Sequence, residues 1–140
     1  MRYLLDTNAC IALLNRTDPG LEARVRRQRV ADVGLPAPVA FELYYGAFRS
    51  RRQQENLSRL DAIGLETVPF DASDARSAGA VRAGLERSGR PIGPYDVLIA
   101  GQARARGLVL VTANTREFAR VDGLECEDWS DRRAAGGRTT

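Results

Sequence analysis

The chain has 140 residues and contains neither histidine nor lysine, so all 21 of its basic residues are arginine. Without histidine, a Ser-His-Asp or Cys-His triad, histidine acid–base catalysis and histidine-ligated zinc are excluded. Without lysine, a P-loop lysine and a Schiff base are excluded as well. The chemistry that remains belongs to carboxylates, hydroxyls and, above all, metal ions held by oxygen ligands.

Long apolar runs and cysteine pairs are missing too. No apolar run approaches the roughly 20 residues that a membrane-spanning helix needs, and no basic segment precedes an apolar one near the N-terminus, so we expect a cytoplasmic protein without membrane contact. Cys10 and Cys126 lack the spacing of a zinc site or a redox pair, and we expect buried thiols. The composition, with 44% hydrophobic and 28% charged residues, predicts one globular domain over residues 1–130 and a disordered tail over residues 131–140.

The basic residues make nucleic acid a candidate partner. The formal net charge is +3 and the isoelectric point is about 9.3. The planar guanidinium group suits bidentate binding of phosphate. A genome rich in G and C would also favour arginine codons over lysine codons, so the arginine content alone decides little.

Short apolar segments alternate with amphipathic ones along the chain. The apolar segments predict strands at residues 3–5, 30–35, 65–70 and 108–111, and a last short strand within residues 121–129. Helices are predicted between them, with starts at Asp18-Pro19, Pro38 and Asp71 and an end at Gly107. This alternation predicts an α/β fold, a three-layer α/β/α sandwich in which helices cover both faces of a parallel sheet.

Three carboxylates stand at positions that suggest a site, and each also has a structural explanation. Asp6 directly follows the first strand, at the end where open α/β sheets bind ligands, although an Asp at this turn can equally cap a helix. Glu42 lies inside an apolar helix, where it either faces solvent or needs a positive partner. Asp96 begins a largely apolar helix, where the helix dipole alone would favour it.

These carboxylates can meet in one crevice. If the strands at 3–5 and 108–111 are neighbours, their carboxyl ends bring Asp6 close to residues 112–117, and Glu42 and Asp96 could project into the same space. A cluster of carboxylates without histidine or lysine repels itself and requires a cation, and Mg²⁺ and Mn²⁺ prefer oxygen ligands. Such ions support phosphodiester hydrolysis, because they activate a water and stabilise both oxygens of an in-line displacement.

Four motifs in order resemble the PIN-domain family: LDTN at residues 5–8, FELYYG at 41–46, IGPYDVLIA at 92–100 and TANTREF at 112–118. Within that family they are similar to the VapC toxins of bacterial type II toxin–antitoxin systems, and the similarity covers about residues 1–130. The resemblance implies a five-stranded parallel sheet, a homodimer and an Mg²⁺- or Mn²⁺-dependent endoribonuclease that cuts structured RNA such as tRNA or rRNA. It also implies inhibition by a VapB-type antitoxin.

The motif positions assign Asp6, Glu42 and Asp96 as catalytic metal ligands. The residues that could support these ligands or position a water are Thr7, Thr112, Asn114 and Glu117. Many family members carry an Asp where this chain has Asn114, so the fourth acidic position is either Asn114 holding a water or Glu117. Because no other general base is available, we expect a metal-activated water as the nucleophile and a 5′-phosphate at the cut.

Several arginines lie near the segments that carry the motifs. Six arginines near these segments are candidate contacts to RNA phosphate, or else solvated surface charges: Arg16, Arg49, Arg51, Arg52, Arg90 and Arg116. The main alternative is a PIN-like DNA nuclease or an RNA-processing nuclease that is not a toxin. A phosphatase or phospho-acceptor domain fits less well, because it needs a second Asp where this chain has Asn8 and a lysine that the chain lacks.

Overall fold

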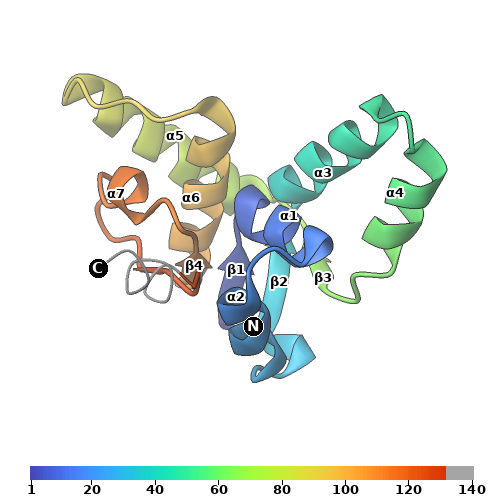
Figure 1. Cartoon of the computed structure of the whole chain (residues 1–140). Coiled ribbons are helices and arrows are strands. Elements are labelled where there is room, and N and C mark those ends of the chain that lie inside the picture. The colour runs from blue at the N-terminus through green and yellow to red at the C-terminus, as the bar shows by residue number, and fades with distance from the viewer. Residues whose placement is uncertain (132–140) are drawn as a thin grey trace, which may run out of the picture.

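The computed structural model describes residues 1–131 and shows five parallel strands flanked by helices (Figure 1). The strand order is β3-β2-β1-β4-β5, so the first strand of the chain is the middle of the sheet. The strands are β1 Tyr3–Leu5, β2 Val33–Pro36, β3 Glu66–Val68, β4 Val109–Val111 and β5 Cys126–Glu127. The predicted sandwich around a parallel sheet is confirmed, and the tail predicted for residues 131–140 lies outside the described residues from 132 onward.

Seven α-helices lie within the described residues: α1 Thr7–Asn15, α2 Pro19–Arg26, α3 Ala37–Arg49, α4 Gln53–Asp61, α5 Ala72–Arg87, α6 Pro94–Arg106 and α7 Thr115–Phe118. Their ends follow capping chemistry. Asp18 accepts from the Leu21 N–H at the start of α2, Asp71 begins α5 with a capping box, and Gly107 ends α6 at a φ of 63°. No helix within residues 1–131 combines the length and apolarity needed to cross a membrane.

The core surrounds the two central strands. Leu4, Leu5 and Leu110 are fully buried, as expected for parallel strands covered on both faces. Helix α6 packs tightly against α5: a Cβ atom added to Gly101 would lie 2.5 Å from the Cα of Ala78. In Figure 1, α3 and α4 extend from the sheet as a pair on one side of α1, and α5 with the start of α6 extends on the other side.

The strand predicted at residues 30–35 is wrong over its first half. Val30–Asp32 form a 3₁₀ turn, η1, and β2 begins only at Val33. Val30 is 67% exposed, so a β-branched residue on the surface imitated the start of a buried strand. The strand predicted at residues 65–70 is likewise shorter, because β3 covers only the three residues before Pro69.

The two cysteines differ in burial. Cys10 in α1 is fully buried, as predicted, whereas Cys126 in β5 is only half-buried, so the prediction is wrong for that thiol. Burial raises the pKa of both thiols, and it raises the pKa of Cys126 to about 11. Neither side chain is therefore a reactive thiolate at neutral pH.

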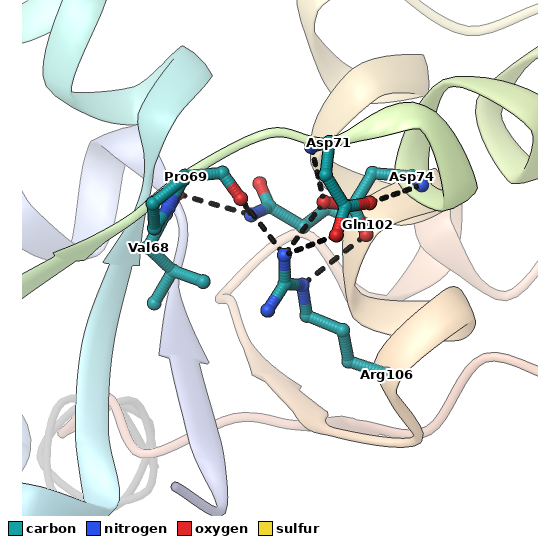
Figure 2. Close-up of polar contacts among 6 residues, drawn as sticks. All are labelled: Val68, Pro69, Asp71, Asp74, Gln102 and Arg106. Atoms are coloured by element: carbon teal, nitrogen blue, oxygen red, sulfur yellow. Dashed lines mark hydrogen bonds and ion pairs between the residues drawn. The ribbon is translucent and has the colours of Figure 1, made fainter.

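An ion-pair network ties the end of β3 and the start of α5 to the last turn of α6 (Figure 2). Nη2 of Arg106 lies 2.9 Å from Oδ2 of Asp74 and 2.8 Å from the carbonyl oxygen of Pro69. Asp74 is only 1% exposed. Gln102 donates through Nε2 to the carbonyls of Val68 and Pro69, both at 3.1 Å. These contacts fix the C-terminal half of α6, whose N-terminal end carries a predicted site residue.

Candidate active site

Asp6 lies directly beyond β1 at the carboxyl edge of the sheet. Its backbone N–H donates to the carbonyl of Val111 at 3.1 Å, which continues the pairing of β1 with β4. Its carboxylate accepts the N–H of Ala9 at 2.8 Å and the hydroxyl of Thr112. Burial raises the pKa of Asp6, and the charge of Glu42 adds to the rise. Capping and membership of a carboxylate cluster are therefore not alternatives, because Asp6 does both.

Glu42 reaches from α3 toward the start of α1. The hydroxyl of Thr7 donates to its Oε1 at 2.8 Å. No arginine within residues 1–131 makes an ion pair or a hydrogen bond with Glu42, so the described chain does not supply the positive partner that this half-buried carboxylate calls for.

Asp96 stands in the first turn of α6 and is half-buried. Its pKa is raised from 3.8 to about 6, first by burial and then by the negative charges of Glu117, Asp6 and Glu42. A Cβ atom at Gly93 would lie 3.4 Å from Oδ2 of Asp96, so the residue that caps α6 lies directly beside this carboxylate. The structure thus brings the other two predicted ligands, Asp6 and Glu42, and also Glu117 within electrostatic range of Asp96.

The turn after β4 forms hydrogen bonds with two of these carboxylates. The Thr112 hydroxyl donates to Asp6 and accepts the N–H of Asn114 at 2.9 Å, and Thr112 is 1% exposed. The side-chain amide of Asn114 donates to Oε2 of Glu117. The position where many family members have an acid thus holds an amide that contacts the neighbouring acid.

The donor set suits a divalent ion in its chemistry, because carboxylate oxygens are the ligands that Mg²⁺ and Mn²⁺ prefer. As the side chains lie, no three His, Cys, Asp or Glu residues among residues 1–131 are close enough to hold an ion. Burial and the negative charges of Glu117, Asp6 and Glu42 raise the pKa of Asp96. A bound cation would relieve this excess of negative charge, so the residues present fit such an ion.

The six predicted arginines are all exposed but differ in their contacts. Arg16 lies 3.0 Å from Glu22, and Arg52 lies 3.7 Å from Glu55. Arg16 also ends α1 in the left-handed region at a φ of 55°, which the sequence did not indicate. Four of these six arginines make no ion pair in the part of the chain that the structure describes: Arg49, Arg51, Arg90 and Arg116.

One further acid near the cluster, Asp128, escaped the sequence analysis. Leu5 pairs with Val111 and Val111 pairs with Glu127, so Asp6 after β1 and Asp128 after β5 follow strand ends at the same edge of the sheet. The charge of Asp128 contributes to the raised pKa of Asp6. The available signal was an Asp directly after a short predicted strand, but β5 has only two residues, one of them Glu127, and gives a weak pattern.

Comparison with known proteins gives a consistent result. The sequence model of the PIN domain matches residues 3–124. A protein of Shigella flexneri named tRNA(fMet)-specific endonuclease VapC is 39% identical over 132 residues, which cover 93% of this chain and 99% of that protein. A protein of Salmonella typhimurium with the same name is 37% identical over 131 residues, with 92% and 98% covered.

Solved structures show the same similarity. The structure of DNA-bound VapBC from Salmonella typhimurium contains a chain that matches with a TM-score of 0.87 at 37% identity, over 92% of this chain and 98% of that one. The structure of VapBC2 from Rickettsia felis with a promoter DNA fragment gives a TM-score of 0.85 at 33% identity, over 93% and 100%.

Proposed function

Since the chain belongs to the PIN-domain family, we propose that it is the ribonuclease toxin of a toxin–antitoxin pair, an endonuclease that hydrolyses RNA phosphodiester bonds. The observation that carries the proposal is the group of carboxylates at the carboxyl edge of β1. Burial and the charges of Glu117, Asp6 and Glu42 raise the pKa of Asp96, and no arginine of the described chain pairs with Asp6, Glu42 or Asp96. An uncompensated acidic cluster is typical of metal-dependent phosphodiester chemistry.

Asp6, Glu42 and Asp96 are the proposed ligands of Mg²⁺ or Mn²⁺. Such an ion, when bound, lowers the pKa of a water and offsets the charge that develops on the phosphate. Glu117 takes the fourth acidic position in this proposal, because its charge acts directly on Asp96. Its carboxylate is oriented by Asn114.

Two hydroxyl groups orient the proposed ligands. Thr112 donates to Asp6, and Thr7 donates to Glu42 at 2.8 Å. Each hydrogen bond selects one orientation of a carboxylate before substrate arrives. The chain has no histidine or lysine to remove the proton of a ribose 2′-hydroxyl, so water is the expected nucleophile and the product carries a 5′-phosphate.

The substrate and the partners follow from the relatives. We propose a tRNA substrate acted on in the cytoplasm, with initiator tRNA as the first candidate, because two relatives carry that specificity in their names. A VapB-type antitoxin is the proposed inhibitor, since the similar structures are VapBC complexes. A homodimer is the proposed assembly of the toxin.

The test is a cleavage assay with the purified chain. Total RNA, initiator tRNA and DNA are incubated with Mg²⁺, with Mn²⁺ or with EDTA, and the ends of any products are mapped. We expect cleavage of tRNA that EDTA abolishes, with 5′-phosphate ends. Asp96→Asn should lower the rate by about a hundredfold or more, since a catalytic ion supplies several kcal/mol to the transition state.

The matched control is Asp122→Asn, which removes an exposed loop carboxylate. Its cleavage rate should equal that of the unchanged protein. Equal cleavage by Asp96→Asn would refute the assignment of the site. Products with 2′,3′-cyclic phosphate would refute water as the nucleophile, and cleavage of DNA alone would identify the chain as a DNA nuclease.

A further inference from the structure

The aromatic side chains of the chain are unevenly placed. The sequence has four Phe and four Tyr. Five of these eight residues are exposed, and all five lie on α3 or in the first turn of α6: Phe41, Tyr44, Tyr45, Phe48 and Tyr95. Large rings normally contribute to the core, and a cluster of them on the surface marks a place where something binds.

Three of these rings form one face of α3. Phe41, Tyr45 and Phe48 follow one another at intervals of four and three residues, which places them on the same side of a helix. Their side chains are 53%, 57% and 59% exposed. Tyr44 lies at the edge of this face that adjoins α4, where its hydroxyl donates to Oδ1 of Asp61 at 3.1 Å.

This face begins at the carboxylate site. The ring of Phe41 lies 5.6 Å from the ring of Tyr95, measured between centroids, with 36° between the planes. Phe41 precedes Glu42, and Tyr95 precedes Asp96. The pair of rings therefore joins α3 to α6 directly beside two of the proposed ligands.

The opposite end of the face is basic. Arg49 ends α3, and Arg51 and Arg52 follow it. Neither Arg49 nor Arg51 makes an ion pair with another residue in the range 1–131. Within residues 41–52, Glu42 is the only acid. The exposed surface thus runs from the carboxylate cluster over rings to free guanidinium groups.

We propose that Phe41, Tyr45 and Phe48, continued by Tyr95, form a stacking platform for unpaired bases of the RNA substrate. The proposal rests on the ribonuclease function proposed above and adds that the RNA next to the cut bond is single-stranded. Rings bind bases of any sequence through their faces, and arginines nearby bind the phosphates of the same strand. Both elements occur here along one helix, in line with the cluster that would cut the strand.

A second copy of the chain is the other possible occupant of an exposed aromatic face. The charges favour RNA, since the unpaired arginines at the end of α3 complement phosphate. The position favours RNA as well. An occupant that covers Phe41 and Tyr95 lies against the proposed ligands, where the substrate must pass.

The test measures binding apart from cleavage. Anisotropy of a labelled single-stranded RNA and of its duplex is recorded in EDTA for four variants: Tyr45→Ala, Tyr45→Leu, Tyr45→Phe and Phe48→Ala. We expect loss of either ring to weaken binding of the single strand about tenfold, as is typical for a stacked base, with little change for the duplex. Tyr45→Leu should be as weak as Tyr45→Ala, because stacking needs a ring, and Tyr45→Phe should bind like the unchanged protein.

Two controls separate stacking from other effects. Tyr44→Ala removes a neighbouring ring that is held toward α4 by its hydrogen bond to Asp61, and this variant should leave RNA affinity unchanged. Arg49→Gln should lower the slope of log affinity against log salt by about 0.7, whereas Tyr45→Ala should leave the slope unaltered.

Unchanged affinity of Tyr45→Ala and Phe48→Ala for the single strand would overturn the platform. The platform would also be overturned if sedimentation showed that these variants no longer self-associate while their RNA affinity per protomer stays constant. The face would then be a contact between copies of the chain. Cleavage by the unchanged protein is assayed in parallel. If the unchanged protein cleaves RNA and the ring variants bind it as well as the unchanged protein does, only the platform is refuted. If the unchanged protein does not cleave RNA but binding depends on the rings, only the ribonuclease function is refuted.

Discussion

The two ends of α6 hold acidic groups in opposite electrostatic surroundings. At the N-terminal end, burial and then the charges of Glu117, Asp6 and Glu42 raise the pKa of Asp96 to about 6. At the C-terminal end, Asp74 is more deeply buried, yet its pKa is lowered. Burial alone would raise that pKa, but hydrogen bonds from the Arg106 guanidinium and the Asp71 backbone outweigh it (Figure 2).

The difference separates stability from function. The chain neutralises the buried acid that holds the fold together, and it does so with a guanidinium 2.9 Å away. It leaves the group around Asp96 without a cation of its own, although exposed arginines are plentiful. A helix fixed at one end by a balanced network can hold an unbalanced cluster at the other end, since packing and ion pairing offset the repulsion.

The largest effect on stability is expected from a substitution that displaces α6 between its two ends. Gly101→Ala places a Cβ atom 2.5 Å from the Cα of Ala78 and forces α6 away from α5. We expect a loss of about 3 kcal/mol in the free energy of unfolding, as for a severe overpacking substitution, measured by urea denaturation. RNA cleavage should fall as well, because Asp96 moves with the helix.

Gly79→Ala is the matched control for that substitution. Gly79 lies in α5 next to Ala78, and a Cβ atom there has nothing within 4 Å. The same chemical change should therefore stabilise the protein by about 0.5–1 kcal/mol, because alanine favours the helix. A loss of stability in both variants would show that the close contact at Gly101 is not what fixes α6.

Much of this fold could be predicted from the sequence, because it depends on local patterns. The apolar run at 3–5, the Asp18-Pro19 helix start and the fully apolar strand near Leu110 each carry their own signal, and the structure confirms all three. The exposed Val30 shows the limit of such patterns. Whether a β-branched residue is covered depends on tertiary contacts that a window of residues does not contain.

The site divides in the same way. Motif spacing indicated that Asp6, Glu42 and Asp96 belong together, and the structure brings them within electrostatic range. Their roles as ligands remain a proposal. The register that places Asp128 near Asp6 could not be predicted, because it depends on which strands are neighbours. The contacts of Gln102 with β3 and of Arg106 with α5 join residues more than 30 positions apart and have no sequence signature.

A second substitution tests the ion pair at the C-terminal end of α6. Arg106→Gln leaves Asp74 buried without its guanidinium partner, and we expect the free energy of unfolding to fall by about 2 kcal/mol. This is less than the 3–5 kcal/mol of a fully buried pair, because 30% of the Arg106 side chain is exposed. The double variant with Asp74→Asn should recover part of the loss, since no buried charge then remains. Full stability of Arg106→Gln would show that the capping bonds alone satisfy Asp74.

The smallest expected effect is a difference in the pH dependence of stability, measured by urea denaturation in EDTA. The folded pKa of Asp74 lies below its ordinary value of 3.8, so its stabilising contribution is present above that pH and is lost as the pH falls further. The folded pKa of Asp96, about 6, lies above 3.8. Between these values the folded chain holds a proton that the unfolded chain has released, so stability falls as the pH rises from 4 to 6.

The loss of unfolding free energy between pH 4 and 6 should amount to about 1 kcal/mol once solvent screening at the half-exposed Asp96 is allowed for. Asp96→Asn should flatten it partly, because the pKa of Asp6 is raised as well. Asp74→Asn should flatten only the loss below pH 4. If Asp96→Asn leaves the slope between pH 4 and 6 intact, the surroundings of Asp96 do not raise its pKa in solution, and the contrast between the two ends of α6 disappears.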